Sequence, residues 1–142
     1  MNEREVKFGS DSYHKSVELR DKILRKPLGL EFSLEFLASE KNQYHLGIFS
    51  GDKILGILLF QVLDNKVVKM RQVAVDNDFQ SKGIGKKLVL FSERFAKEKG
   101  FEKIVLNARD TAVSFYKKLN YKIVSDKFIE VGIEHFVMEK DI

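Results

Sequence analysis

The stretch from Met70 to Phe91 constrains the fold more than any other part of the chain. Four of the six residues 70–75 are apolar and two are β-branched valines, like a mostly buried strand. Ile84, Leu88 and Phe91 follow at the spacing that places side chains on one face of a helix. The turn between strand and helix contains two glycines and a lysine. A strand, a glycine-rich turn and a helix in this order predict an α/β protein with a ligand-binding loop.

The turn before this helix has the chemistry of an anion site. The first backbone N–H groups of a helix have no partner within it, and the aligned peptide dipoles leave about half a positive charge there. Gly83 and Gly85 lack the Cβ atoms that would keep a bulky anion from the backbone, and Lys82, Lys86 and Lys87 add positive charge. The sequence therefore predicts a phosphorylated ligand.

The spacing of the loop excludes two common phosphate motifs. The dinucleotide pattern G-x-G-x-x-G fails because Leu88 occupies its third glycine position. The P-loop pattern fails because this sequence lacks its first glycine and has Lys87 in place of its hydroxyl residue. The remaining pattern, Q-x-x-G-x-G after a strand ending in Ala74-Val75, resembles the acyl-CoA signature of the GNAT superfamily of N-acyltransferases. A glycine-bearing turn without a ligand is the alternative interpretation of the loop alone.

The resemblance implies that acetyl-CoA is the acyl donor. In the family, the loop amides hold the pyrophosphate of coenzyme A and the preceding strand pairs with its pantetheine arm. The residues that it assigns to the coenzyme are Val73, Ala74, Val75, Gln80, Ser81, Lys82, Gly83, Ile84, Gly85 and Lys86. The backbone N–H of Val73 or Val75 would stabilise negative charge on the thioester oxygen.

Composition narrows the class of protein. The chain has 142 residues, which suits one domain over residues 1–142, and its net charge of +4 is spread along the sequence. It has no cysteine, so thiolate metal sites and disulfides are excluded, and we assign no metal. No apolar stretch is long enough for a membrane span or signal peptide. We expect a cytoplasmic protein without membrane or nucleic-acid partners. A homodimer is one alternative for its assembly, and the residues do not decide between this and a monomer.

The rest of the chain alternates between strand and helix signals. The strand from residue 66 to 75, the signature helix and the next strand form a βαβ crossover, so these two strands should be parallel. The predicted strands span residues 4–8, 44–49, 53–63, 66–75, 101–107, 121–126 and 133–139, and the helices begin near residues 11, 34, 84 and 111. The resemblance implies an α/β GNAT fold: a mixed, twisted sheet of about seven strands with about four helices, splayed between the fourth and fifth strands.

A second match lies in the last helix. The run from Ala112 to Tyr121 resembles the family pattern A-x-x-F/L-Y-x-K-x-G-F/Y, whose tyrosine protonates the departing thiolate and stands near the coenzyme. Tyr116 occupies that position, although a tyrosine at helical spacing is also a common core residue. Asn120 replaces the usual glycine and tolerates the same left-handed conformation. Arg109 replaces a capping asparagine, and Asn107 is the candidate for binding the coenzyme arm.

The end of the chain carries a histidine in a recurring context. Gly132-Ile133-x-His135-x-x-Met138 resembles the ending of the ElaA-like branch of the superfamily. His135 is either a half-buried strand histidine bonded to backbone or a base beside the acceptor amine, since its ordinary pKa lies near neutrality. No carboxylate stands where some relatives have a base on the signature strand, because Lys69 occupies that position.

Arginines near the first helix and on the signature strand are candidates for acceptor binding. Arg20 and Arg25 either belong to a solvated helix face or border the substrate cleft. Arg71 either binds an acidic acceptor or forms a salt bridge. We assign Arg25 and Arg71 to the acceptor site.

Together these features predict an N-acetyltransferase. It would move an acetyl group from acetyl-CoA to a primary amine of a small molecule or peptide, by direct attack in a ternary complex. The alternative is an acyl-CoA-binding module without catalysis. A basic nucleic-acid binder is disfavoured, because the aromatic residues lie on apolar faces rather than along a lysine and arginine stripe.

Overall fold

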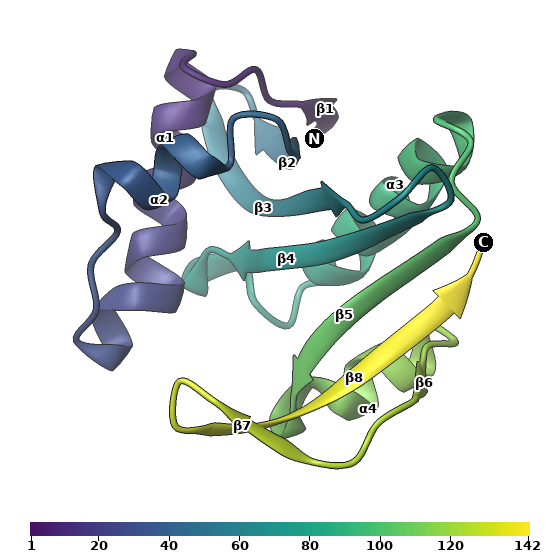
Figure 1. Cartoon of the computed structure of the whole chain (residues 1–142). Coiled ribbons are helices and arrows are strands. Elements are labelled where there is room, and N and C mark those ends of the chain that lie inside the picture. Colours follow the sequence, from purple (N-terminus) through teal and green to yellow (C-terminus); the bar gives the residue numbers. More distant parts are fainter.

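The computed structural model describes residues 1–142 as an eight-stranded sheet with helices on both faces (Figure 1). The strands are β1 (Asn2–Glu5), β2 (Tyr44–Ser50), β3 (Lys53–Val62), β4 (Val67–Val75), β5 (Lys103–Arg109), β6 (Lys122–Ile123), β7 (Phe128–Glu130) and β8 (Ile133–Asp141). The α-helices are α1 (Asp11–Arg20), α2 (Leu34–Ser39), α3 (Ile84–Glu98) and α4 (Val113–Lys118). Short helices are η1 (Asp21–Arg25), η2 (Lys26–Leu28), η3 (Asn77–Phe79) and η4 (Asp110–Ala112). None of the helices has the length and apolar character needed to span a lipid bilayer.

Local sequence signals account for the boundaries of the first two helices. The Ser10 side chain accepts a hydrogen bond from the Tyr13 backbone N–H at 3.2 Å, and Ser33 accepts one from Phe36 at 3.0 Å. Each serine thereby caps a helix N-terminus. After α1 the chain continues as one π-helical segment and one 3-10 turn, and it leaves the turn through Gly29 in the left-handed conformation. Arg25 is the last residue of the π-helical segment that follows α1.

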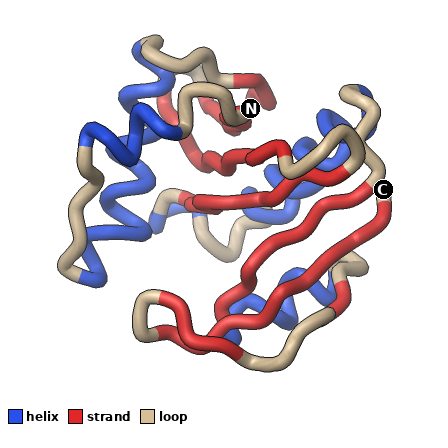
Figure 2. The backbone as a smooth tube through the Cα atoms, in the orientation of Figure 1, coloured by secondary structure: helices blue, strands red, loops and turns tan.

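The sheet is antiparallel except at its centre. Its strand order is β1-β2-β3-β4-β5-β8-β6, with β7 on β8, and β4 and β5 form the parallel pair that the βαβ crossover predicts. That pairing runs from Val67 and Lys103 to Met70 and Leu106 and then stops. Beyond it, β4 and β5 diverge toward their carboxyl ends, as Figures 1 and 2 show. The predicted splay between the fourth and fifth strands is confirmed.

A β-bulge in β4 accompanies the splay. Gln72 has a φ of 56°, in the left-handed region, and the register between β3 and β4 shifts between Ile57 and Leu59. Such a bulge turns the following side chains and increases the local twist of the strand. Met70 therefore packs into the core on the α3 side, whereas Ala74 belongs to the core under α1.

Two hydrophobic cores lie on opposite faces of the sheet. The larger one joins α3 and α4 to the sheet and includes Leu88, Ile104 and Met138, each fully buried. The smaller one lies under α1 and includes Tyr13, Leu19 and Ile57. Burial of these apolar side chains supplies the main favourable free energy of folding.

The structure differs from the sequence predictions mainly at the ends of the chain. The first strand covers Asn2–Glu5 rather than residues 4–8, because Val6 already turns into the core beneath α1. The strand predicted over residues 121–126 shrinks to Lys122–Ile123. Residues 127–132, which were expected only to connect the last two strands, include a short strand, β7, that forms a hairpin with β8. The count is therefore eight strands, where about seven were expected.

Truncating Leu88 should destabilise the protein by about 2–5 kcal/mol, because Leu88→Ala leaves a cavity between α3 and the sheet. The matched control is Leu34→Ala, since Leu34 is 86% exposed and its truncation should cost about 0.5 kcal/mol or less. Urea unfolding of both variants measures the difference. Equal losses at the two positions would contradict the placement of Leu88 in the core.

Candidate functional site

The loop between β4 and α3 is held in an unusual backbone conformation. Ser81 and Gly83 both have positive φ values, 63° and 80°, and Gly83 directly precedes the first residue of α3. A side chain at Gly83 would be strained whatever space surrounds it. Left-handed residues that alternate with other conformations are typical of anion-binding loops, in which successive N–H groups form a concave surface.

The backbone amides of this loop are free. None of six successive N–H groups donates a hydrogen bond within the chain; they belong to Ser81, Lys82, Gly83, Ile84, Gly85 and Lys86. The first amide of the helix to donate is that of Lys87, to the Gly83 carbonyl at 3.0 Å. Free backbone donors at the start of a 15-residue helix form a site for an anion with several oxygens.

A Cβ atom at Gly85 would make only ordinary contacts with the protein. An added Cβ would lie 3.5 Å from Cζ of Phe115 and 3.8 Å from Cγ2 of Val75, which are ordinary contact distances. Packing inside the protein therefore does not require glycine at this position. The residues present fit a diphosphate, because close approach of a ligand to the backbone explains the missing side chain.

The charge around the loop is positive. Lys82, Lys86 and Lys87 are exposed and form no ion pair. The ammonium groups of Lys53 and Lys82 lie 4.9 Å and 5.6 Å from the centre of the Phe79 ring, so one aromatic ring organises two of the local cations. The loop thus combines free amides with mobile positive charge.

Gln80 has a supporting role that the sequence did not reveal. Its side-chain Nε2 donates to the Val75 carbonyl at 3.0 Å and to Oδ1 of Asn77 at 3.1 Å. These bonds connect the end of β4 to the start of the loop. The glutamine side chain therefore shapes the turn, and the amides that follow it remain free.

The divergence of β4 and β5 leaves one edge of β4 without a strand partner. This edge runs from Arg71 to Val75 and includes the predicted residues Val73, Ala74 and Val75. Asn107 is the first residue of β5 beyond the parallel pairing, and its side-chain amide makes no hydrogen bond within the chain. An extended ligand can use these unpaired groups.

Tyr116 lies in the larger core at the base of α4. Its side chain is 7% exposed, and its ring contacts those of Phe115 and Tyr121 with centroids 5.0 Å and 5.6 Å away. Burial raises the pKa of Tyr116 above its ordinary value, so the hydroxyl is protonated at neutral pH. Because Phe115 also lies over Gly85, α4 brings Tyr116 to the helix that begins at the anion loop.

His135 lies on the other face of the sheet from Tyr116. It is directly opposite Arg109 in the β5 and β8 pairing, whereas the neighbouring Ala108 belongs to the core that contains Tyr116. Its Nδ1 is 2.7 Å from the Ile133 carbonyl oxygen, and its Nε2 is 3.6 Å from a carboxylate oxygen of Glu130. Phe128 stacks on the ring. The backbone contact that the first interpretation of His135 predicts is present.

A buried ion pair occupies the face of β4 that faces α1 and α2. Nη2 of Arg20 lies 2.7 Å and 2.9 Å from the two carboxylate oxygens of Glu40, and both side chains are fully buried. Arg20 also donates to Oε1 of Gln72 at 3.3 Å and 3.4 Å, at the bulge of β4. The interpretation of Arg20 as part of a solvated helix face is wrong, because its guanidinium joins α1 to the end of α2 and to β4.

Arg71 adds to this group. Its Nη1 donates to Oε1 of Gln43 at 3.0 Å and lies 3.4 Å from Glu40. The predicted salt bridge of Arg71 is therefore present, although it shares a carboxylate already bonded to Arg20. Sequence analysis missed Glu40 and Gln72; Glu40 directly follows the α2 helix, but nothing in its local pattern indicates burial.

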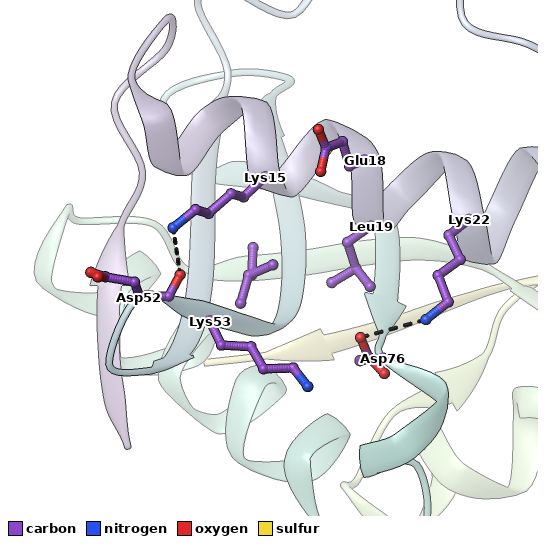
Figure 3. Close-up of a pocket in the computed structure, with 8 residues that line it drawn as sticks. Lys15, Glu18, Leu19, Lys22, Asp52, Lys53 and Asp76 are labelled. Carbon is purple, nitrogen blue, oxygen red and sulfur yellow. Dashed lines mark hydrogen bonds and ion pairs between the residues drawn. The ribbon is translucent and has the colours of Figure 1, made fainter.

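A separate surface pocket lies between α1 and the β2–β3 hairpin. It encloses about 330 Å³ and is lined largely by lysines and carboxylates (Figure 3). Nζ of Lys15 donates to the Asp52 carbonyl at 2.7 Å, and Lys22 lies 3.7 Å from Asp76. Its lining includes none of the residues of the splayed edge or the anion loop. The ion pair of Lys22 with Asp76 instead ties η1 to the residue that follows β4.

Comparisons with known proteins agree with this geometry. A family model described as an acetyltransferase (GNAT) domain matches residues 28–142. An uncharacterized N-acetyltransferase of Bacillus subtilis, YjcF, is 29% identical over 124 residues, which cover 87% of this chain and 88% of that protein.

Two solved structures share the fold. Escherichia coli ElaA has a TM-score of 0.84 at 14% identity, with 99% of both chains covered. A GNAT family acetyltransferase from Elizabethkingia anophelis, solved with acetyl-CoA bound, has a TM-score of 0.77 at 16% identity, covering 99% of this chain and 97% of that one. The predicted α/β fold with its splayed mixed sheet is confirmed.

Acidification should weaken the folded state through His45, which contacts the Glu40 carbonyl from beneath α1. Burial lowers its pKa below the ordinary 6.5, so the unfolded chain binds a proton first as the pH falls through about 6.5. The stability present above that pH is then lost by up to about 1.4 kcal/mol per pH unit.

Urea unfolding of the protein and of His45→Gln at about pH 7.5 and about pH 5.5 measures this contribution. The variant cannot titrate at this position, so it should lose less stability over the interval. Identical pH dependence in the two proteins would contradict the lowered pKa of His45.

Proposed function

The chain belongs to the GNAT acetyltransferase domain family, and on that premise we propose that it transfers an acetyl group from acetyl-CoA to a primary amine of a small molecule or peptide. The observation that carries this proposal is the row of six free amides from Ser81 to Lys86. Four of these six residues are exposed, so a ligand can reach their N–H groups, and a row of free donors at a helix start favours an anion with several acceptor oxygens.

The splayed edge of β4 gives the donor its direction. An extended amide-containing arm that follows this edge can accept and donate hydrogen bonds where β5 no longer does, with Val73, Ala74 and Val75 on one side and Asn107 on the other. With the phosphates at the loop, the far end of the arm lies toward the point where β4 and β5 meet. The edge therefore sets the position of the thioester.

The chain's own groups supply the proton and the polar environment. Acetyl-CoA supplies an activated carbonyl; the amine nitrogen forms a bond to this carbon, and the bond between carbon and sulfur breaks. Burial keeps Tyr116 protonated at neutral pH. Its hydroxyl donates a proton to the sulfur as that atom takes the electron pair, and regains one from solvent after the thiol leaves. Backbone N–H groups at Val73 or Val75 stabilise charge on the carbonyl oxygen.

The amine approaches from the opposite face of the sheet. His135, Arg71 and Arg25 border that face, which separates the group that receives the amine from the group that protonates the sulfur. His135 accepts the proton of the amine through Nε2, directly or through water, while Nδ1 stays bonded to the Ile133 carbonyl. Holding both substrates in one geometry supplies much of the acceleration.

The alternative is a module that binds acyl-CoA without catalysis. It needs the loop but neither Tyr116 nor an open acceptor face. Incubation of the protein with acetyl-CoA and a panel of primary amines separates the two functions, because only the enzyme releases free thiol in proportion to amine. Coenzyme binding without thiol release from every amine would favour the module.

Replacing Gly85 with glutamate should strongly weaken coenzyme binding without unfolding the protein. The added Cβ meets Phe115 and Val75 only at ordinary contact distances, and a carboxylate near a helix N-terminus is favourable for the helix. It would nevertheless occupy the anion site, so affinity for acetyl-CoA should fall by more than about tenfold in calorimetry.

The charge control for Gly85→Glu is Asn65→Glu, which places the same charge in the turn between β3 and β4. Its affinity for acetyl-CoA should remain within about twofold of the unaltered protein. Undiminished affinity in Gly85→Glu would overturn the placement of the phosphates at this loop.

Removing the hydroxyl of Tyr116 should lower turnover and spare binding. We expect Tyr116→Phe to reduce kcat by more than about tenfold while calorimetry shows unchanged affinity for acetyl-CoA. The control is Tyr44→Phe, which removes a hydroxyl from a half-buried tyrosine that packs on Phe95. Unchanged turnover in Tyr116→Phe would exclude this residue as the proton donor.

A further inference from the structure

Three arginines and two phenylalanines form a continuous group between α1, α2 and β4, here called the arginine wall. The rings of Phe32 and Phe36 stack with centroids 5.7 Å apart and an angle of 12° between their planes. The Arg25 guanidinium lies 4.6 Å from the Phe32 centroid and 5.2 Å from that of Phe36. Arg20 lies over Phe32 at 4.9 Å and Arg71 near Phe36 at 5.9 Å.

The wall carries more positive than negative charge. Glu40 is the one carboxylate paired with it, and its two oxygens serve Arg20 and Arg71. Arg25 forms no ion pair, and neither Glu31 nor Glu35 pairs with any of the three arginines. Three guanidinium groups and one carboxylate leave a net charge of +2. Nη1 of Arg20 is buried and has no hydrogen-bond partner, which is a second sign of an unfilled polar requirement.

The wall borders the opening between the central strands. Arg71 is the first residue of β4 beyond the parallel pairing, and its contacts with Glu40 and Gln43 place it on the face away from α3. The segment η1, which ends at Arg25, packs against β4. The anion loop belongs to the start of α3, so the charge of the wall is not part of the phosphate site.

Resting on the function proposed above, we propose that the acceptor amine carries a carboxylate, and that Arg25 and Arg71 bind this group at the wall. An arginine that stacks on an aromatic face keeps its in-plane N–H groups free to donate, and its planar fork matches a carboxylate in two bonds. The stacked rings of Phe32 and Phe36 present an apolar surface to the body of such an acceptor.

The same charges act against other acceptors. A polycationic amine placed at the wall meets two uncompensated positive charges in a partly desolvated site, where like charges repel more strongly than in water. An amine without a carboxylate lacks the group that would accept hydrogen bonds from the guanidinium N–H groups of the wall. The wall therefore selects acids, such as amino acids or peptides with a nearby carboxylate.

The test compares acids and their amides as ligands, so that it does not depend on turnover. The probes are N-acetylglycine, N-acetyl-L-leucine and N-acetyl-L-phenylalanine, each with its primary amide, titrated calorimetrically into the full chain saturated with coenzyme A and into the free chain. We expect at least one acid to bind more than about tenfold more tightly than its amide.

Variants assign this preference to the wall. Arg25→Gln and Arg71→Gln should each reduce the preference to less than about threefold, whereas Lys26→Gln, which removes the same charge next to Arg25, should leave it unchanged. Arg25→Gln is the decisive variant, because Arg25 makes no ion pair whose loss would disturb the fold. Equal affinity for acid and amide in every pair, or no binding of any acid, would overturn the proposal.

The outcome is distinguishable from failure of the proposed function. If the chain does not bind coenzyme A, the acid preference is measured on the free chain and is upheld or overturned there. If coenzyme A binds and Gly85→Glu abolishes that binding, the donor site stands whatever the probes show.

Discussion

The parallel pairing of β4 with β5 ends at Met70 and Leu106, and the candidate site depends on that limit. A central strand normally has both edges bonded, because unpaired backbone groups inside a protein are costly. Here β4 keeps β3 on one edge and loses β5 on the other just before the bulge at Gln72. The loop that follows β4 also has unpaired backbone groups, namely six free amides. Backbone groups rather than side chains thus provide most of the proposed donor site.

The bulge has a dedicated support in the ion pair of Arg20 and Glu40. Taking two charges out of water costs several kcal/mol per ion, so a buried pair adds little net stability compared with a packed apolar pair. The ion pair instead fixes the positions of its neighbours, since the Arg20 guanidinium contacts Glu40 at the end of α2 and the Gln72 side chain at the β-bulge. The positive φ of Gln72 persists because its surroundings hold it.

The features that sequence analysis predicted correctly are those encoded by neighbouring residues. The strand, turn and helix around Gly83 and Gly85, the left-handed Asn120 and the crossover to β5 all follow from local patterns. Arg20 was misplaced because its partners are 20 and 52 residues away, and helical periodicity alone gives its position as solvated. The hairpin of β7 with β8 was missed for a similar reason: its pairing, not its composition, makes it a strand.

The two hydrophobic cores described above are separated by the sheet itself. The core with α3 and α4 lies on the face of the proposed donor loop, and the core with α1 lies on the face of the arginine wall, where we propose that the acceptor binds. Under the proposed function, substitutions in α1, η1 and α2 can suit a new amine without changing the loop that would hold the acyl donor. The set of acetylated amines can then change through substitutions on one face of the sheet, while the residues proposed to bind acetyl-CoA stay the same.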